Sequence, residues 1–145
     1  FMPTVIETSV GLDRTMLALL SAAYDEEKAA TAKEGMEEDT RIVLHLPPLV
    51  APIQVAVLPQ SKKLKEQAYG LYKDIDRRFR SEYDETGSIG KRYRRQDEIG
   101  TPFCVTYDFQ SEEDGCVTVR DRDSMKQERI SIDKLNDYIA ERIDF

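Results

Sequence analysis

One short stretch of this chain limits its fold more than any other, because residues 53–59 read Ile-Gln-Val-Ala-Val-Leu-Pro. Such a nearly unbroken apolar run, ended by a proline, is typical of a strand that is covered on both faces. Ser61 then suits the N-cap of a helix, in which apolar residues recur from Leu64 to Phe79 at three- and four-residue spacing. A doubly covered strand followed at once by an amphipathic helix indicates an α/β domain.

The remainder of the chain extends this pattern. The expected elements are an edge strand or loop at residues 83–87, a helix at 89–99 that Gly100 ends, strands at 103–109, 116–120 and 127–132, and a last helix that Asp133 caps. The last three strands are close enough in sequence to pair as antiparallel hairpins. We therefore predict an α/β fold with a mixed five-stranded sheet flanked by three helices.

The first 45 residues predict a strand-and-helix stub. An extended stretch runs from Val5 to Gly11, and a helix with an apolar stripe begins near Thr15. The acidic run at residues 25–39 follows, with Met36 as its one large apolar side chain. Because it lacks apolar surface to fold onto a core, we predict an exposed linker; a solvated helical extension is an equal alternative for its first half.

Three prolines mark the expected boundary between this stub and the main domain. They lie in residues 46–52, Leu-Pro-Pro-Leu-Val-Ala-Pro, where they fix φ and remove backbone donors. We therefore assign residues 1–45 to the stub and its acidic linker. Residues 46–145 form the main domain, which has an ordinary size for an independent folding unit.

The charge distribution leaves a nucleic-acid partner open. A net charge of −7 argues against such a partner at first sight. Residues 24–40, however, hold seven acids and two bases, whereas residues 61–95 hold eleven bases and six acids. A local basic face can hold RNA within a Debye length even when the whole chain is acidic.

Several classes of function are disfavoured. The chain has no apolar run of about 18 residues and no signal peptide at residues 1–10, so we expect a soluble, cytoplasmic protein without membrane contact. Cys104 and Cys116 lack CxxC spacing and read as reduced strand residues, with metal binding a poor second. His45 is the one histidine and reads as structural or exposed more readily than as a general base. Without a nucleophile elbow, phosphate loop or zinc spacing, we expect no complete catalytic site and no metal in this chain.

A first candidate site lies at residues 7–14, Glu-Thr-Ser-Val-Gly-Leu-Asp-Arg. Arg14, after Gly11 and at the start of a helix, can place its guanidinium near a phosphate or above an adenine ring. Glu7 and Ser9 are two residues apart and would lie on the same side of a strand. The alternative is a surface salt bridge between Arg14 and its neighbour Asp13.

A second candidate site combines residues 83–103 with residues 119–125. Two glycines precede a basic-aromatic helix whose Lys91, Arg92, Arg94 and Arg95 can donate to phosphates, while its tyrosine can stack on a base. Residues 120–123, Arg-Asp-Arg-Asp, alternate in charge at the end of a strand. The alternative is a surface on which these arginines and aspartates neutralise each other.

Both stretches resemble a known family. Residues 5–14 resemble motif 3 of class II aminoacyl-tRNA synthetases in its glycyl-specific form. Residues 84–103 and 119–125 closely resemble the anticodon-binding domain of glycyl-tRNA synthetases, and residues 49–59 are similar to its linker and first strand. The resemblance covers nearly the whole chain. It implies that residues 1–45 are the C-terminal remnant of a catalytic domain and that residues 46–145 are an anticodon-binding domain.

The resemblance also implies an activity for a longer protein. Members of the family are homodimers that activate glycine with ATP and Mg²⁺ and attach it to their tRNA. By resemblance, Arg14 would contact ATP, while Glu7 and Ser9 would face the glycine. Motifs 1 and 2 are absent from this chain, so we expect it to be inactive alone and to need no cofactor.

The expected partner is the glycine tRNA, with no DNA partner. Glycine anticodons carry cytosines at their second and third positions, and a cytosine N4 donor is best met by a carboxylate. The candidate anticodon contacts are Lys91, Arg92, Arg120 and Arg122 for phosphates and bases, Phe109 as a stacking platform, and Asp108, Asp121 and Glu141 as acceptors. A place for Phe109 in the core is nearly as good an interpretation.

Two other functions compete with this one. A stand-alone nucleic-acid-binding module of the same superfamily would keep the RNA contacts without belonging to a ligase. A dimerisation or scaffold domain would instead pair its basic helix with an acidic protein surface. Salt-sensitive binding to tRNA separates the scaffold from the two RNA-binding alternatives.

Overall fold

The computed structural model describes residues 2–28 and 40–143 of the chain. The elements are α1 (Leu12–Ala23), β1 (Tyr24–Lys28), β2 (Thr40–Leu44), β3 (Val55–Pro59), the 3₁₀ turn η1 (Lys62–Leu64), α2 (Lys65–Asp76), β4 (Ser81–Tyr83), α3 (Ile89–Ile99), β5 (Phe103–Tyr107), α4 (Ser111–Asp114), β6 (Cys116–Asp121), β7 (Gln127–Ser131) and α5 (Ile132–Ile143). No helix in these two ranges is long and apolar enough to span a bilayer.

The main sheet confirms the predicted mixed topology. Its five strands lie in the order β4-β3-β5-β6-β7. Strand β3 is parallel to β4 and β5, whereas β6 is antiparallel to both β5 and β7. The parallel pairs are joined through helices and the antiparallel pairs through short connections, as connection length requires.

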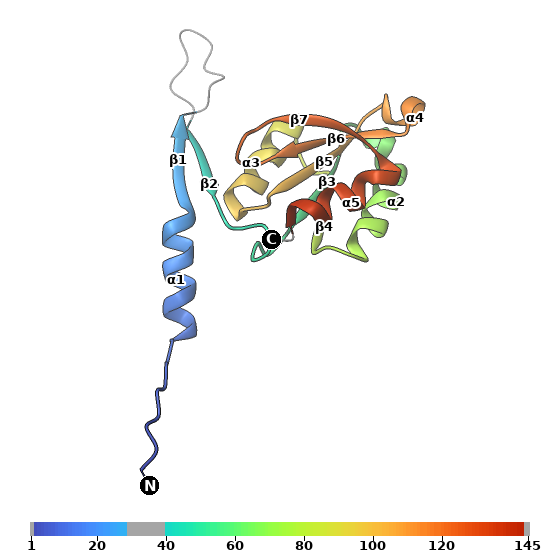
Figure 1. The fold of residues 1–145 in the computed structure, drawn as a ribbon. Helices are drawn as coiled ribbons and strands as arrows, with labels where there is room; N and C mark the ends of the chain where they lie inside the picture. Colours follow the sequence, from blue (N-terminus) through green and yellow to red (C-terminus); the bar gives the residue numbers. More distant parts are fainter. Residues whose placement is uncertain (1, 29–39, 144–145) are drawn as a thin grey trace.

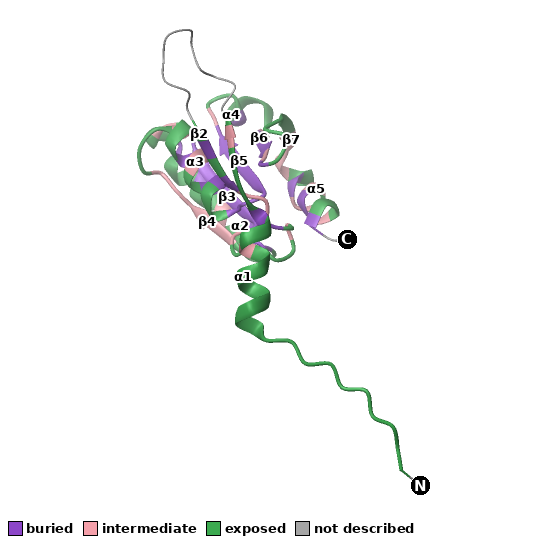
Figure 2. Ribbon diagram, turned by 90° about the vertical axis from the view of Figure 1, so that its left-hand side faces the viewer, coloured by how far each residue is buried: buried purple, intermediate pink, exposed green. Residues whose placement is uncertain are grey.

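Helices cover both faces of this sheet (Figure 1). On one face, α2 and α5 pack their apolar stripes against alternate strand residues such as Val57 and Val105. On the other face, α3 covers Ala56, Leu58 and Cys104. Strand β3 is therefore buried along its whole length, as its apolar sequence predicts, and Figure 2 shows the buried strands between their helices.

The acidic segment after α1 differs from the prediction. Residues 24–28 form strand β1, which pairs antiparallel with β2 and brings Asp25 opposite Val43. They are therefore neither a linker nor a helical extension. The partner strand decides this outcome, because the backbone groups of β1 are satisfied by residues 40–44, which we did not predict as a strand. Residues 29–39, the rest of the predicted linker, lie outside the described residues.

The hairpin of β1 and β2 is attached to the main sheet through α3. Arg41 and Val43 on β2 are 4% and 0% exposed, and Arg41 donates to Asp97 on α3 at 2.8 Å. Residues 40–44 are therefore packed as part of the main domain, although the predicted boundary between residues 45 and 46 excludes them. The division of the chain at that boundary stays a prediction.

The N-terminal residues extend away from the domain. Residues 2–11 form no strand, contrary to the prediction, and α1 projects beyond the hairpin (Figure 1). A single extended segment without a partner strand cannot pair its backbone groups. Leu12, Met16 and Leu17 on α1 are exposed, and only the end of α1 joins a small apolar cluster, through Leu20 and Ala23.

The end of α3 fits closely against the segment that follows β2. Gly100 caps α3 with φ +83°, and a Cβ at this position would lie 2.9 Å from Leu46 Cδ1 and 3.0 Å from the Leu44 carbonyl oxygen. Gly115 also has a positive φ, +62°, but a Cβ there would meet nothing within 4 Å. Both glycines adopt a left-handed backbone, but only Gly100 is also close to neighbouring atoms. A comparison of the two positions therefore distinguishes the cost of the backbone conformation from the cost of the steric contact.

We expect Gly100→Ala to destabilise the protein more than Gly115→Ala. Each change should cost about 1–2 kcal/mol for the left-handed backbone, since alanine disfavours it. Gly100→Ala should cost about 1–3 kcal/mol more, because its methyl group overpacks the contact with Leu44 and Leu46. Urea unfolding of both variants measures the difference. Equal decreases in the free energy of unfolding would show that Leu44 and Leu46 move to accommodate the methyl group without an energetic penalty.

Candidate nucleic-acid interface

The side chains of β6 divide the predicted site between two faces of the sheet. Successive residues on a strand point to opposite faces. Arg120 lies beside Cys104 on the face that α3 covers, whereas Asp121 lies beside Phe103 on the face of α5. The alternating charges at the end of this strand therefore lie in two separate environments, Arg120 under α3 and Asp121 on the face of α5.

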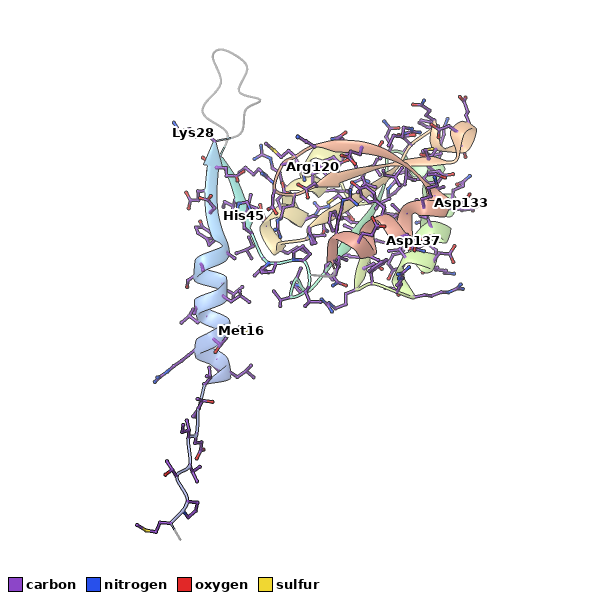
Figure 3. The ribbon with its side chains drawn as sticks, viewed as in Figure 1. Met16, Lys28, His45, Arg120, Asp133 and Asp137 are labelled. Carbon is purple, nitrogen blue, oxygen red and sulfur yellow. The ribbon has the colours of Figure 1, made fainter. Side chains whose placement is uncertain are left out.

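On the α3 face, Arg120 belongs to a buried ionic cluster. Its guanidinium donates to both carboxylate oxygens of Asp97, at 2.8 and 3.0 Å, and stacks over the Tyr93 ring at 4.9 Å. Arg41 donates to the same carboxylate at 2.8 Å. The Asp97 side chain is 2% exposed, so two guanidinium groups satisfy one carboxylate inside the protein. Figure 3 shows Arg120 within the domain.

Arg92 and Arg122 also have structural roles, because their guanidinium groups donate to acceptors within the protein. Arg92 donates to the carbonyl oxygens of Pro59 at 2.6 Å and Gly87 at 2.9 Å, which ties the loop before α3 to the end of β3. Arg122, 2% exposed, donates to the carbonyl oxygens of Leu46 at 2.9 Å and Gly100 at 2.8 Å. These bonds satisfy backbone acceptors where chain segments leave regular structure.

These contacts show where the structure places three of the predicted arginines. The basic helix and the strand end do converge, but they bury Arg92, Arg120 and Arg122. The three guanidinium groups donate to protein acceptors, so the structure does not support direct phosphate or base contacts by them. Lys91 and Arg95 are the exposed members of the predicted basic set, and Arg95 already pairs with Asp84.

Two predicted residues lie after β5. Asp108 accepts from Arg129 at 2.8 Å and from the Ser111 backbone N–H at 2.9 Å. Hydrogen bonds from Arg129 hold the pKa of Asp108 below its ordinary value, against a smaller opposing effect of burial. The carboxylate is thus ionised and already paired. Phe109 is 51% exposed, which excludes the core placement in this structure and leaves its ring accessible for stacking.

The face of α5 carries a groove beside Asp121. Its volume is about 190 Å³, and its lining is Phe103, Val119, Asp121, Ser124, Lys126, Glu128, Tyr138 and Arg142. Asp121 accepts from the Ser124 N–H at 2.8 Å and its hydroxyl at 2.6 Å. Both bonds end on Oδ1, so Oδ2 can accept from a ligand.

The groove contains chemistry that the sequence analysis missed. Arg142 lies 3.5 Å from the Tyr138 ring centroid, and Tyr138 donates to Glu128 at 2.8 Å. The four-residue spacing of Tyr138 and Arg142 on one helix was the available signal. Lys126 adds an exposed cation at the rim. An apolar floor with an aromatic ring, cations and acceptors suits a polar planar ligand such as a base.

Glu141 lies near this groove, whereas the N-terminal candidates lie far from it. Glu141 lines an adjoining hollow that shares Tyr138. Glu7, Ser9 and Arg14 are exposed on the extended segment and α1, away from the domain (Figure 1). The groove and the adjoining hollow do not include these three side chains, and their ATP and glycine contacts stay a prediction.

The cysteines match their predicted positions. Cys104 lies in β5 and Cys116 in β6, and both are free. Burial raises the pKa of the Cys104 thiol to about 12, so it remains protonated at neutral pH. Neither cysteine contributes to the groove.

Comparison with known proteins decides the family. Residues 54–142 match the family model described as "Anticodon binding domain". The chain belongs to this family. The matched residues run from just before β3 into α5, so they contain the five-stranded sheet and the groove on its α5 face.

The relatives of this anticodon-binding domain are consistent with each other. Proteins named glycine–tRNA ligase from Caldanaerobacter subterraneus subsp. tengcongensis and Agathobacter rectalis are 58% and 57% identical to the chain over all 145 residues. The chain spans 30% of the length of each. The RNA-binding domain of threonyl-tRNA synthetase from Cryptosporidium parvum has a similar structure, with a TM-score of 0.63, 26% identity, and coverage of 68% of this chain and 25% of that one.

Proposed function

We propose that this chain recognises the anticodon of glycine tRNA as part of a cytoplasmic, homodimeric glycine–tRNA ligase. The observation that carries the proposal is the anticodon-binding match over the residues that build the sheet and its groove. Support for the proposed glycine specificity comes from the relatives named glycine–tRNA ligase, which match the whole chain. ATP, Mg²⁺ and glycine would be bound by the longer protein, with Glu7, Ser9 and Arg14 contributing as the resemblance implies.

The groove on the α5 face is the proposed contact with the anticodon loop. Asp121 would accept from the N4 amino group of a cytosine, a bond that a uracil cannot donate. Tyr138 and Arg142 would pack against a base, and Lys126 would meet a phosphate. Glu141 borders the same region from α5 and is a second candidate acceptor. On the opposite face, Lys91 is the alternative phosphate contact.

Binding of tRNA to the full-length ligase tests this assignment, because other parts of the enzyme also contact the tRNA. Lys126→Ala should weaken binding of every tRNA alike and reduce the slope of log K against log salt by about 1, since one phosphate contact is lost. Lys91→Ala is the matched control on the other face and should change neither. If only Lys91→Ala has this effect, the interface lies on the α3 face.

Selectivity should depend on the carboxylate. We expect Asp121→Asn to reduce the preference for a CC anticodon over a changed one by about 1–3 kcal/mol, because the amide presents a donor beside the cytosine amino group. Competition between glycine tRNA and its anticodon variants measures this preference at constant salt. An unchanged preference, with a normal response to Lys126→Ala, would contradict the role of Asp121 and leave the groove assignment intact.

A further inference from the structure

The hairpin of β1 and β2 carries a cluster of side chains that the proposed function does not use. Asp25, Glu27 and His45 each present one ligand atom, and these three atoms lie within 4.8 Å of one another. Asp25 and Glu27 alternate along β1, so they share one face of the hairpin, while His45 follows β2 directly. His45 Nε2 lies 3.2 Å from Glu27 Oε1 and 4.0 Å from Asp25 Oδ2.

A fourth residue fixes the orientation of the imidazole ring. His45 Nδ1 lies 2.6 Å from Asp123 Oδ1, on the turn between β6 and β7. This contact places the ring proton on Nδ1, because a carboxylate oxygen accepts and cannot donate when ionised. Nε2 of the neutral ring then carries a lone pair that faces two carboxylate oxygens. Histidines that bind a metal through one ring nitrogen usually donate the N–H of the other nitrogen to a carboxylate or a carbonyl oxygen. The contact of His45 Nδ1 with Asp123 has this geometry.

The neighbouring cations leave this arrangement incomplete. Arg41 pairs with Glu27 through the other carboxylate oxygen, Oε2, at 2.6 Å. Arg122 pairs with Asp123 at 2.8 Å. A donor at Nε2 can bond to Glu27 but lies too far from Asp25 Oδ2, at 4.0 Å, for a hydrogen bond, while Asp25 Oδ1 accepts from the Glu26 backbone N–H at 2.8 Å. A cation between the three ligand atoms would satisfy all of them at once.

We propose that Asp25, Glu27 and His45 form a binding site for a divalent transition-metal ion of the zinc type. Zinc binds imidazole nitrogen and carboxylate oxygen at about 2.0–2.2 Å, so neighbouring ligands in a tetrahedral site lie about 3.3 Å apart. The pair of His45 and Glu27 has about this separation already, at 3.2 Å. Asp25 Oδ2 lies 4.0 Å from His45 Nε2 and would have to move closer to both other ligand atoms, all three of which lie within 4.8 Å of one another. The mixed nitrogen and oxygen ligands favour zinc over magnesium or calcium, which prefer oxygen alone. The fourth position remains for water or a ligand.

The position of the site gives it a structural consequence. His45 lies between the hairpin and the main domain (Figure 3). Its ring joins two strand residues of the hairpin to the β6–β7 turn through Asp123. A bound ion would therefore fix the hairpin, and with it α1, against the anticodon-binding domain.

Zinc titration of the full chain tests the site. We expect one equivalent of Zn²⁺ to bind, measured by competition with a chromophoric chelator, and to raise the temperature of unfolding. His45→Gln and Asp25→Asn should each weaken binding at least about tenfold, since each removes one of three ligands. Glu26→Gln is the matched control, because Glu26 lies on the opposite face of the same strand and its replacement also removes one negative charge. The zinc affinity of this variant should equal that of the unchanged chain.

Cobalt substitution identifies the ligands directly. Bound Co²⁺ should show visible bands of a site with nitrogen and oxygen ligands, without a thiolate charge-transfer band. A thiolate band would assign the metal to Cys116, the partly exposed cysteine, and would overturn the proposal. Two further results would also overturn it. One is the absence of binding, which would mean that the contacts between His45 and the carboxylates form without a metal ion. The other is equal binding by the Glu26→Gln and His45→Gln variants, which would indicate a nonspecific acidic surface.

Discussion

Replacement of Asp97 by asparagine should lower the free energy of unfolding by about 3–5 kcal/mol, the usual loss when one partner of a buried ion pair is removed. Asp97 accepts from Arg41 and from Arg120, and its side chain is 2% exposed. The asparagine amide would keep the size of the side chain but remove its charge. Two guanidinium groups would then be buried beside a neutral group that also carries a donor.

Asp137→Asn is the matched control for this prediction. Asp137 pairs with Arg78 at 3.2 Å, and the two side chains are 78% and 51% exposed. An exposed pair contributes little because water and salt screen it, so we expect a change within about 0.5 kcal/mol. Urea unfolding of both variants, at one pH and salt concentration, provides the comparison. A small loss for Asp97→Asn would show that water reaches the cluster and solvates its charges.

Removal of residues 1–45 should destabilise the protein far more than removal of residues 1–39. A chain that starts at Thr40 keeps β2, whose Val43 is fully buried and whose Arg41 pairs with Asp97. A chain that starts at Leu46 loses both. Burial of a valine contributes about 1.5–3 kcal/mol, and loss of Arg41 leaves Asp97 with a single guanidinium partner. We expect a combined loss of at least about 3 kcal/mol.

The two truncated chains also test the domain boundary. A cooperative urea transition at the same midpoint for both would support the predicted division between residues 45 and 46, and would show that β2 adds nothing to the core. The expected result, a much less stable chain without residues 40–45, would instead place the domain boundary at the start of β2. It would mean that the hairpin is one structural unit with the anticodon-binding domain, so that its orientation is set by α3.

The regular elements of the main domain could be predicted because they depend on local patterns. The apolar run at residues 53–59 contains β3, buried on both faces. The spacing of apolar residues predicted α2, and Gly100 ends α3 with a positive φ. Alternation identified β6 and β7, and short connections made their pairing antiparallel. In each case the signal lies within a few residues, where periodicity and turn chemistry act.

The hairpin and the state of the charged residues depended on the tertiary structure. Strand β1 has an acidic sequence that favours no strand by itself, and pairing with residues 40–44 makes it one. Arg120 reads like any surface arginine until Asp97, 23 residues earlier in the chain, and Arg41, 56 residues before Asp97, meet it in the core. Composition and spacing do not record such contacts. A guanidinium is buried or free according to which acceptors the fold brings to it, and that is decided only when distant segments pack together.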